Sequence, residues 1–201
     1  SLLISNGVPP WSVLALTLTN KAAGEMKERV ESLVPAESGT ARGLVVSTFH
    51  SFCARLLRRY SDQVGLSKNY SIYDTSDQIA LMKDVVKKLD LSSTNFKPQA
   101  LLATISNAKN ALEGPAAFSL GASDFWQKQT ARVYLAYEQE LKNRDAVDFD
   151  DLLVLVAELI KNNDEVREQL QQRFRYILVD EYQDTNHAQF SIAHYLASAH
   201  G

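Results

Sequence analysis

An apolar, β-rich segment of this chain ends directly in two carboxylates, Asp180 and Glu181. The segment, Tyr176 to Val179, has the length and composition of a strand buried in a parallel sheet. Open α/β sheets place their ligands at the carboxyl ends of such strands. The pattern therefore predicts an α/β fold with a ligand site at these two carboxylates. A loop start or a helix cap is the alternative, because short motifs have low specificity.

Two earlier segments each combine a strand with a helix that follows at once. Val13 to Thr19 is rich in aliphatic and β-branched residues, and Asn20 then opens a pattern of apolar residues at helical spacing. Leu44 to Thr48 is a second short strand, followed by a helix with one apolar face. The polar side chains at the two junctions are Thr17, Thr19, Asn20, Thr48, His50 and Ser51. Small polar side chains beside free helix amides commonly hold phosphate, so both junctions are candidate phosphate contacts.

The middle of the chain has the apolar spacing of helices and little strand signal. The expected helices begin at Thr75, Pro98 and Phe125. The first has the pattern of a capping box, with the hydroxyl of Thr75 at the cap and the amide side chain of Gln78 three residues later. Ala116 to Ala122 is small and contains glycine, so a loop is expected there.

An acidic run surrounds the aromatic residue Phe149 and consists of Asp148, Asp150 and Asp151. Carboxylates bind hard cations, which would favour a metal site. Acids in the first turn of a helix also complement its macrodipole and cap free amides. Because apolar residues follow at helical spacing and no further ligand pattern does, we expect a helix start here. An aromatic residue in such a position usually belongs to the core.

Composition limits the classes of protein to which the chain can belong. Its 201 residues are 45% hydrophobic, which is enough for a core, and no stretch of about 18 apolar residues is present to span a membrane. Cys53 is the single cysteine and is expected in the core rather than in a disulfide or a zinc site. Basic residues outnumber acidic ones between residues 20 and 60, although the whole chain carries a net charge of −3. This excess favours polyanion binding, with ordinary solvated helix faces as the alternative. The expected location is cytoplasmic.

Three motifs in a fixed order resemble those of the UvrD/Rep/PcrA group of superfamily 1 DNA helicases. Asp180 to Asn186 resembles the second helicase motif of that group. Ala15 to Met26 resembles its motif Ia, and Ser47 to Cys53 resembles its motif Ib. Val147 to Leu153 is similar to the acidic stretch at the end of the helical domain that the family carries as an insertion. The resemblance covers nearly the whole chain.

The resemblance implies a site for ATP and Mg²⁺. It implies Asp180 as a catalytic residue and the Mg²⁺ ligand, Glu181 as the catalytic residue that orients the attacking water, and Gln183 as a further nucleotide-binding residue. The implied path of single-stranded DNA follows Thr17, Leu18, Thr19, Asn20, Thr48, Phe49, His50 and Phe149. The family usually has an aromatic residue where this chain has Leu18. Leucine offers apolar contact but no stacking, so we expect a weaker DNA contact at this position.

The implied fold is α/β, with a partial RecA-like parallel sheet domain at residues 1–70 and 174–201 and an all-helical subdomain inserted at residues 71–173. The implied function is that of an ATP-dependent 3′-to-5′ DNA helicase or translocase acting on single-stranded DNA and duplex junctions in repair, replication or recombination. The implied partners are the remaining domains of the parent helicase and proteins of repair or replication. No Gly-x-x-x-x-Gly-Lys-Ser/Thr phosphate loop occurs in the sequence. We therefore expect a fragment that by itself neither hydrolyses ATP nor unwinds DNA.

Two other functions remain open from the sequence. A non-catalytic module would bind single-stranded DNA or a protein partner through the same contacts, without nucleotide turnover. A metal-dependent nuclease would group Asp148 and Asp150 with Asp180 and Glu181, around paired ions about 3.5 to 4 Å apart.

Overall fold

The computed structural model describes residues 2–33 and 43–200, and the chain divides into two compact units. The first unit contains residues 1–56 and 156–201, and the second contains residues 57–155. The first is built on a parallel sheet with flanking helices, and the second is mainly helical. The predicted α/β fold with a parallel sheet is therefore confirmed.

The limits of the two units fall inside helices α3 (Phe49–Arg59) and α8 (Phe149–Asn162). The helical subdomain that the resemblance implies, 71–173, begins and ends later in the chain than the second compact unit. The motif-based division stays a prediction.

Within residues 2–33 and 43–200, the sheet of the first unit has three parallel strands in the order β2-β1-β5. Its strands are β1 (Val13–Thr17), β2 (Val45–Thr48) and β5 (Tyr176–Val179). Every residue of the central strand is buried, as its continuous apolar composition predicts for a parallel sheet. In the register of the sheet, Thr17 at the end of β1 pairs with Thr48 at the end of β2. Leu16, the residue before Thr17, pairs with Val179 at the end of β5. All three strands therefore end at the same edge of the sheet.

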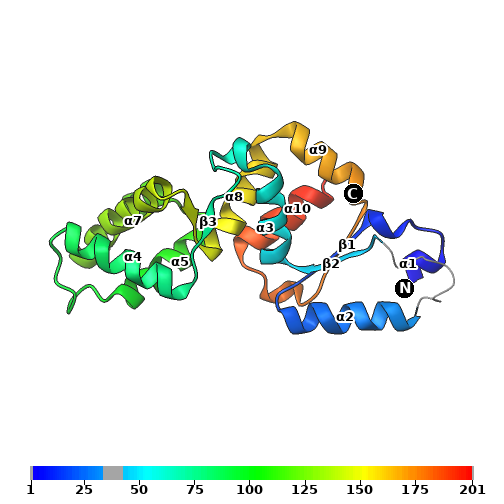
Figure 1. Ribbon diagram of the computed structural model, residues 1–201, viewed down its shortest axis with the longest axis horizontal. Helices are drawn as coiled ribbons and strands as arrows, with labels where there is room; N and C mark the ends of the chain where they lie inside the picture. Colours follow the sequence, from blue (N-terminus) through cyan, green and yellow to red (C-terminus); the bar gives the residue numbers. More distant parts are fainter. Residues whose placement is uncertain (1, 34–42, 201) are drawn as a thin grey trace. The chain divides into compact units, whose positions relative to one another are not determined.

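Helices cover both faces of this sheet. Helix α2 (Asn20–Leu33) packs on β1 and β2, whereas α10 (His187–Ala197) packs on β5 and on α9 (Asp164–Arg173). Figure 1 shows α2 on one side of the strands and α10 on the other. In the described part of the unit, the remaining short elements are α1 (Leu2–Ser5), η1 (Pro10–Ser12) and η4 (Tyr182–Asp184). Phe52 and Phe174 form an edge-to-face pair in the core, with ring centroids 5.8 Å apart.

Strand β5 is more exposed than its apolar sequence predicts. Tyr176 is 40% exposed and Leu178 is 48% exposed, while the alternate residues Ile177 and Val179 share a pocket with α10. Among the described residues, β5 pairs with β1 alone. The expectation of a buried strand is therefore wrong, because a buried strand needs cover on both faces and β5 has helical cover on the α10 face only.

The second unit packs its helices around one apolar core. Its main helices are α4 (Thr75–Lys88), α5 (Pro98–Asn110), α6 (Pro115–Gly121) and α7 (Phe125–Asn143). The central residues of the core are Leu81, Met82, Val85, Leu101, Ile105, Val133 and Tyr137. Two-residue strands, β3 (Ser71–Ile72) and β4 (Ala146–Val147), pair in parallel beside a 3₁₀ turn, η3 (Ser61–Val64). The predicted helical character of this region is confirmed.

Two local predictions in the second unit are wrong. The capping box of α4 is formed by Asp74 and Asp77, one residue before the predicted Thr75 cap, because the carboxylate of Asp74 accepts the Asp77 amide and the exchange is reciprocal. The predicted loop over residues 116–122 is mostly the helix α6. Proline suits its first position, and Phe118 packs edge-to-face on the ring of Tyr134, 6.0 Å away, so tertiary contact supports a helix that composition alone does not indicate.

No helix within residues 2–33 and 43–200 combines the length and the apolar character needed to cross a membrane.

Candidate functional site at the carboxyl edge of the sheet

The junction between β1 and α2 holds its polar residues in a capped turn. The buried hydroxyl of Thr17 donates to the backbone oxygen of Thr19 at 3.0 Å. The exposed hydroxyl of Thr19 in turn accepts the amide of Ala22 at 3.1 Å, which caps the first turn of α2. Asn20 is exposed at the start of the helix, and Leu18 is half-buried. Thr17 therefore supports the turn, while Thr19 and Asn20 present polar atoms to solvent.

The junction between β2 and α3 repeats this device. The hydroxyl of Thr48 accepts the amide of Ser51 at 3.1 Å and donates to its hydroxyl at 2.9 Å. His50 is half-buried beside this cap. Phe49 has no exposed surface and belongs to the core. The apolar face of α3 therefore turns the Phe49 side chain inward, and the DNA contact that the resemblance implies for this residue stays a prediction.

The two carboxylates follow β5 at the same edge. The amide of Asp180 donates to the backbone oxygen of Leu16 at 3.0 Å, so the residue continues the sheet ladder, and its side chain is half-buried. Glu181 is exposed and adopts a left-handed backbone conformation, with φ of 53°. This conformation costs a residue other than glycine on the order of 1 to 3 kcal/mol, and such strain concentrates at functional sites. Gln183 donates its amide to the Glu181 carboxylate at 2.6 Å.

The register of the sheet brings these three junctions together. Thr17 and Thr48 are paired across β1 and β2, and Asp180 follows the β5 residue that pairs with Leu16. Chain segments far apart in sequence therefore present Asn20, His50 and Asp180 along one sheet edge. This is the edge where parallel α/β sheets bind ligands.

Phe149 lies in the second unit, at the first position of α8, and is 43% exposed. The predicted helix start at the surrounding acids is confirmed. Asp148 and Asp151 cap the helix reciprocally, each accepting the backbone amide of the other, at 2.9 and 3.0 Å. The exposed ring contrasts with the usual core position of an aromatic residue, and it leaves the side chain available for stacking.

The nuclease interpretation loses support from the contacts of Asp148. One of its oxygens accepts the Asp151 amide, and the other accepts the Nζ of Lys109 at 2.8 Å and the hydroxyl of Tyr137 at 3.1 Å. Both oxygens are therefore engaged by protein donors. In the part of the chain that the structure describes, no three His, Cys, Asp or Glu side chains are grouped to hold a metal ion.

Lys109 is a buried charged residue that the sequence pattern did not single out. Its Nζ lies 2.6 Å from Glu138, 2.8 Å from Asp148 and 2.7 Å from Asp151. Burial opposes its charge, but the three carboxylates raise the pKa of Lys109 well above its ordinary value. Burial, with the charges of Asp148 and Glu138, raises the pKa of Asp151 to about 8 against the opposing effect of Lys109. The sequence signal for this burial was that Lys109 occupies a position where the apolar spacing of its helix predicts a buried side chain.

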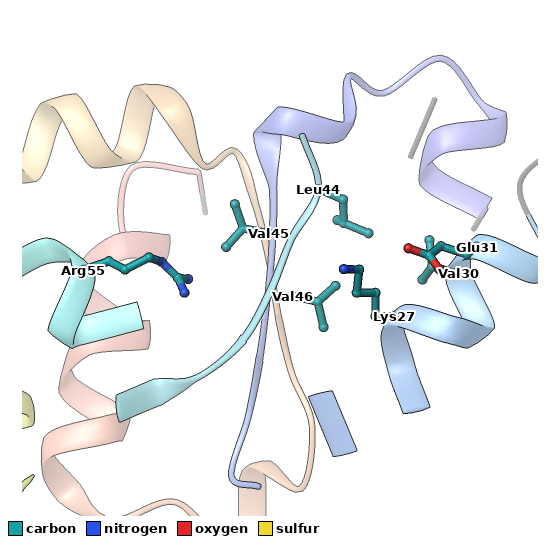
Figure 2. A pocket seen from close by; sticks show the side chains of 7 residues that line it. All are labelled: Lys27, Val30, Glu31, Leu44, Val45, Val46 and Arg55. Carbon is teal, nitrogen blue, oxygen red and sulfur yellow. The ribbon is translucent and has the colours of Figure 1, made fainter. Parts of the chain in front are cut away.

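Figure 2 shows a pocket of about 280 Å³ at the outer edge of β2. It is lined by Lys27, Val30, Glu31, Leu44, Val45, Val46 and Arg55. The pocket lies along the first half of β2, whereas Thr48 ends the strand at its other extremity. It is therefore separate from the carboxyl-edge site. Cys53, in the same helix as Arg55, is buried, and burial raises the pKa of its thiol, as expected of a core residue.

Comparisons with known proteins agree with the motifs. A family model described as the UvrD/REP helicase N-terminal domain matches residues 1–201. The chain is 45% identical over 197 residues to the ATP-dependent DNA helicase PcrA of Staphylococcus aureus, and 44% identical over 196 residues to the helicase of the same name from Bacillus subtilis. Each match covers 98% of this chain but only 27% and 26% of those relatives. A Leuconostoc citreum PcrA is 46% identical over 188 residues, which are 94% of this chain and 25% of that protein. The chain thus spans about a quarter of the length of these relatives.

Proposed function

The chain belongs to the UvrD/REP helicase N-terminal domain family, and on this premise we propose that the whole protein is an ATP-dependent DNA helicase that moves 3′ to 5′ on single-stranded DNA. The observation that carries the proposal is the meeting of three strand ends at one sheet edge, where Asp180 and Glu181 stand beside two polar strand-to-helix junctions. The proposed substrates are single-stranded DNA and duplex junctions. The proposed partners are further domains of the same protein and proteins of DNA repair, replication or recombination.

The proposed nucleotide site uses the acidic side of this edge. Mg²⁺ is held in such sites by one or two carboxylates together with water and phosphate oxygens. No described residue makes a hydrogen bond or ion pair with the Asp180 carboxylate, so this side chain fits the role of a Mg²⁺ ligand. Mg²⁺ and ATP supply the transferable phosphoryl group and the neutralising charge when they are bound. Glu181 orients the attacking water, and the amide of Gln183 holds the Glu181 carboxylate in place.

The proposed DNA path uses the two strand-to-helix junctions and the exposed ring of α8. Thr19, Asn20 and His50 provide polar contacts to the DNA backbone, and Phe149 stacks on a base. Thr17 and Thr48 support this path indirectly, because their side chains are buried and their hydroxyls hold the two turns. The Phe49 side chain is buried in the core. Leu18 gives an apolar contact without stacking.

A binding experiment tests the DNA path in this chain. We expect a labelled single-stranded oligonucleotide to bind in a salt-sensitive way and Phe149→Ala to weaken binding about tenfold by fluorescence anisotropy. His50→Ala should also weaken it. Phe125→Ala is the matched control, because Phe125 is likewise an exposed first helical residue that follows a capping aspartate. Equal losses from both phenylalanine variants would contradict the path.

An ATPase measurement tests the nucleotide side. Phosphoryl transfer needs several groups positioned together, and this sequence lacks a phosphate loop, so the chain alone should give background turnover with single-stranded DNA. Turnover that Asp180→Ala abolishes would overturn that expectation. In a longer version of the protein that includes a phosphate loop, Glu181→Gln should lower DNA-stimulated turnover at least about a hundredfold. Unchanged turnover there would favour a non-catalytic binding module.

A further inference from the structure

The second unit contains one cation enclosed by three acids. Lys109 is 2% exposed, and its Nζ is within 2.8 Å of a carboxylate oxygen from each of Glu138, Asp148 and Asp151. The hydroxyl of Tyr137, on α7, donates to Asp148 at the same place. Burying so many charges is costly unless geometry and hydrogen bonds compensate. A group of this kind is weak evidence for stability, so its position in the fold is the more informative property.

Two of these acids are the residues that cap α8. Asp148 and Asp151 each accept the backbone amide of the other on one carboxylate oxygen, and each accepts the Nζ of Lys109 on its second oxygen. Lys109 belongs to α5 and Tyr137 to α7. The first turn of α8 is therefore tied to two other helices of the same unit through its own capping side chains. Phe149 is the residue between the two caps that starts this turn and remains exposed.

We propose that Lys109 is a positioning residue for the contact between Phe149 and single-stranded DNA: it fixes the first turn of α8 through Asp148 and Asp151, and so fixes the direction in which the aromatic ring is presented. The inference rests on the proposed function. Because Lys109 is buried, it has no surface with which to bind a phosphate, and its effect on DNA passes through α8.

A double-mutant cycle distinguishes positioning from a general loss of structure. We expect Lys109→Met to weaken single-stranded DNA binding about fivefold when Phe149 is present, and less than about twofold when Phe149 is already alanine, because coupled residues are not additive. Lys88→Met is the control, since Lys88 forms a lysine–carboxylate pair with Glu140 in the same unit but at the surface, and it should leave binding unchanged. Equal effects of Lys109→Met in both backgrounds would overturn the proposal.

A second measurement does not depend on DNA. Hydrogen exchange should show faster exchange of the first-turn amides of α8 in Lys109→Met, with α4 and α7 still protected. If Lys109→Met does not fold, Tyr137→Phe can be used, because it removes only the hydrogen bond to Asp148. It should also speed the exchange of the first-turn amides of α8, but by a smaller factor. Unchanged exchange in both variants would overturn the positioning role itself. Faster exchange together with no effect of Phe149→Ala on DNA would instead reject the DNA contact of the proposed function.

Discussion

The two units of the chain differ in which polar and apolar groups they bury. The sheet unit keeps polar side chains at the ends of its strands and leaves one apolar face of β5 exposed. The helical unit encloses its apolar core and also buries a lysine among three carboxylates. In the first unit, the functional residues are expected at the carboxyl ends of the strands. In the second, charged groups lie inside and hold a helix start.

Because of this contrast, we expect substitutions in the helical unit to change stability and substitutions at the sheet edge to change binding. Exposed residues at the sheet edge, such as Asn20 at the start of α2, can change without loss of buried area, whereas each buried group of the helical unit has several partners. The chain has two tryptophans, Trp11 in the first unit and Trp126 in the second, so a variant with either one replaced by phenylalanine reports unfolding of a single unit.

We expect the strongest effect from Lys109→Met. Removing one partner of a buried ion group leaves uncompensated charge and lowers the free energy of unfolding by about 3 to 5 kcal/mol. Trp126 fluorescence in a Trp11→Phe background, followed during urea unfolding, measures the loss in the second unit. Lys88→Met should leave the unfolding midpoint nearly unchanged, and a similar loss in both variants would remove the distinction between buried and surface charge.

A pair of leucine truncations compares the enclosed core with the open strand. Leu101→Ala should lower the free energy of unfolding of the second unit by about 3 kcal/mol, because the side chain is fully buried and a cavity remains. Leu178→Ala should cost the first unit less than about 1 kcal/mol, since nearly half of the side chain is already in water. Denaturation monitored separately by Trp126 and Trp11 gives both values. Comparable losses would show that β5 is covered in solution.

The pH dependence of the second unit should follow Asp151. Its folded pKa of about 8 lies above the ordinary value of 3.8, so between these pH values the folded state keeps a proton that the unfolded state has released. The contribution of Asp151 to the free energy of unfolding therefore falls as the pH rises from about 4 to about 8. None of the four histidines lies in this unit. Unfolding at pH 5 and pH 8 should show lower stability at pH 8, with a smaller difference in Asp151→Asn. A rise in stability over this range would contradict the assignment.

The smallest effect expected is at the start of α4. Asp74→Ala removes the cap and should destabilise the second unit more than Thr75→Ala does, because Asp74 accepts the Asp77 amide at 2.9 Å. Thermal unfolding reported by Trp126 compares the two variants directly. A larger loss from Thr75→Ala would restore the cap position that the sequence predicts.

Local patterns predicted much of the fold because their information lies within a few residues. The three strands, the helix from Phe125 and the helix start beside Phe149 all follow from apolar spacing and capping residues. The predicted cap of α4 differs from the observed one by one residue, because Asp, Thr and Ser all suit a cap and occur side by side at residues 74–76. The helix α6 does not follow from local sequence, because its seven residues, Pro115–Gly121, show no clear apolar period and the helix depends on the packing of Phe118 on Tyr134.

The order of motifs, the α/β character and the placement of polar residues directly after strands can all be predicted from the sequence, since each depends on neighbours in the chain. Which of these residues meet depends on the tertiary structure, because parallel register brings Thr17, Thr48 and Asp180 to one edge although they are separated by most of the chain. It also turned Phe49 inward, left β5 open on one face, and enclosed Lys109 among carboxylates from other helices. Burial and charge pairing depend on segments distant in sequence, and no local pattern contains them.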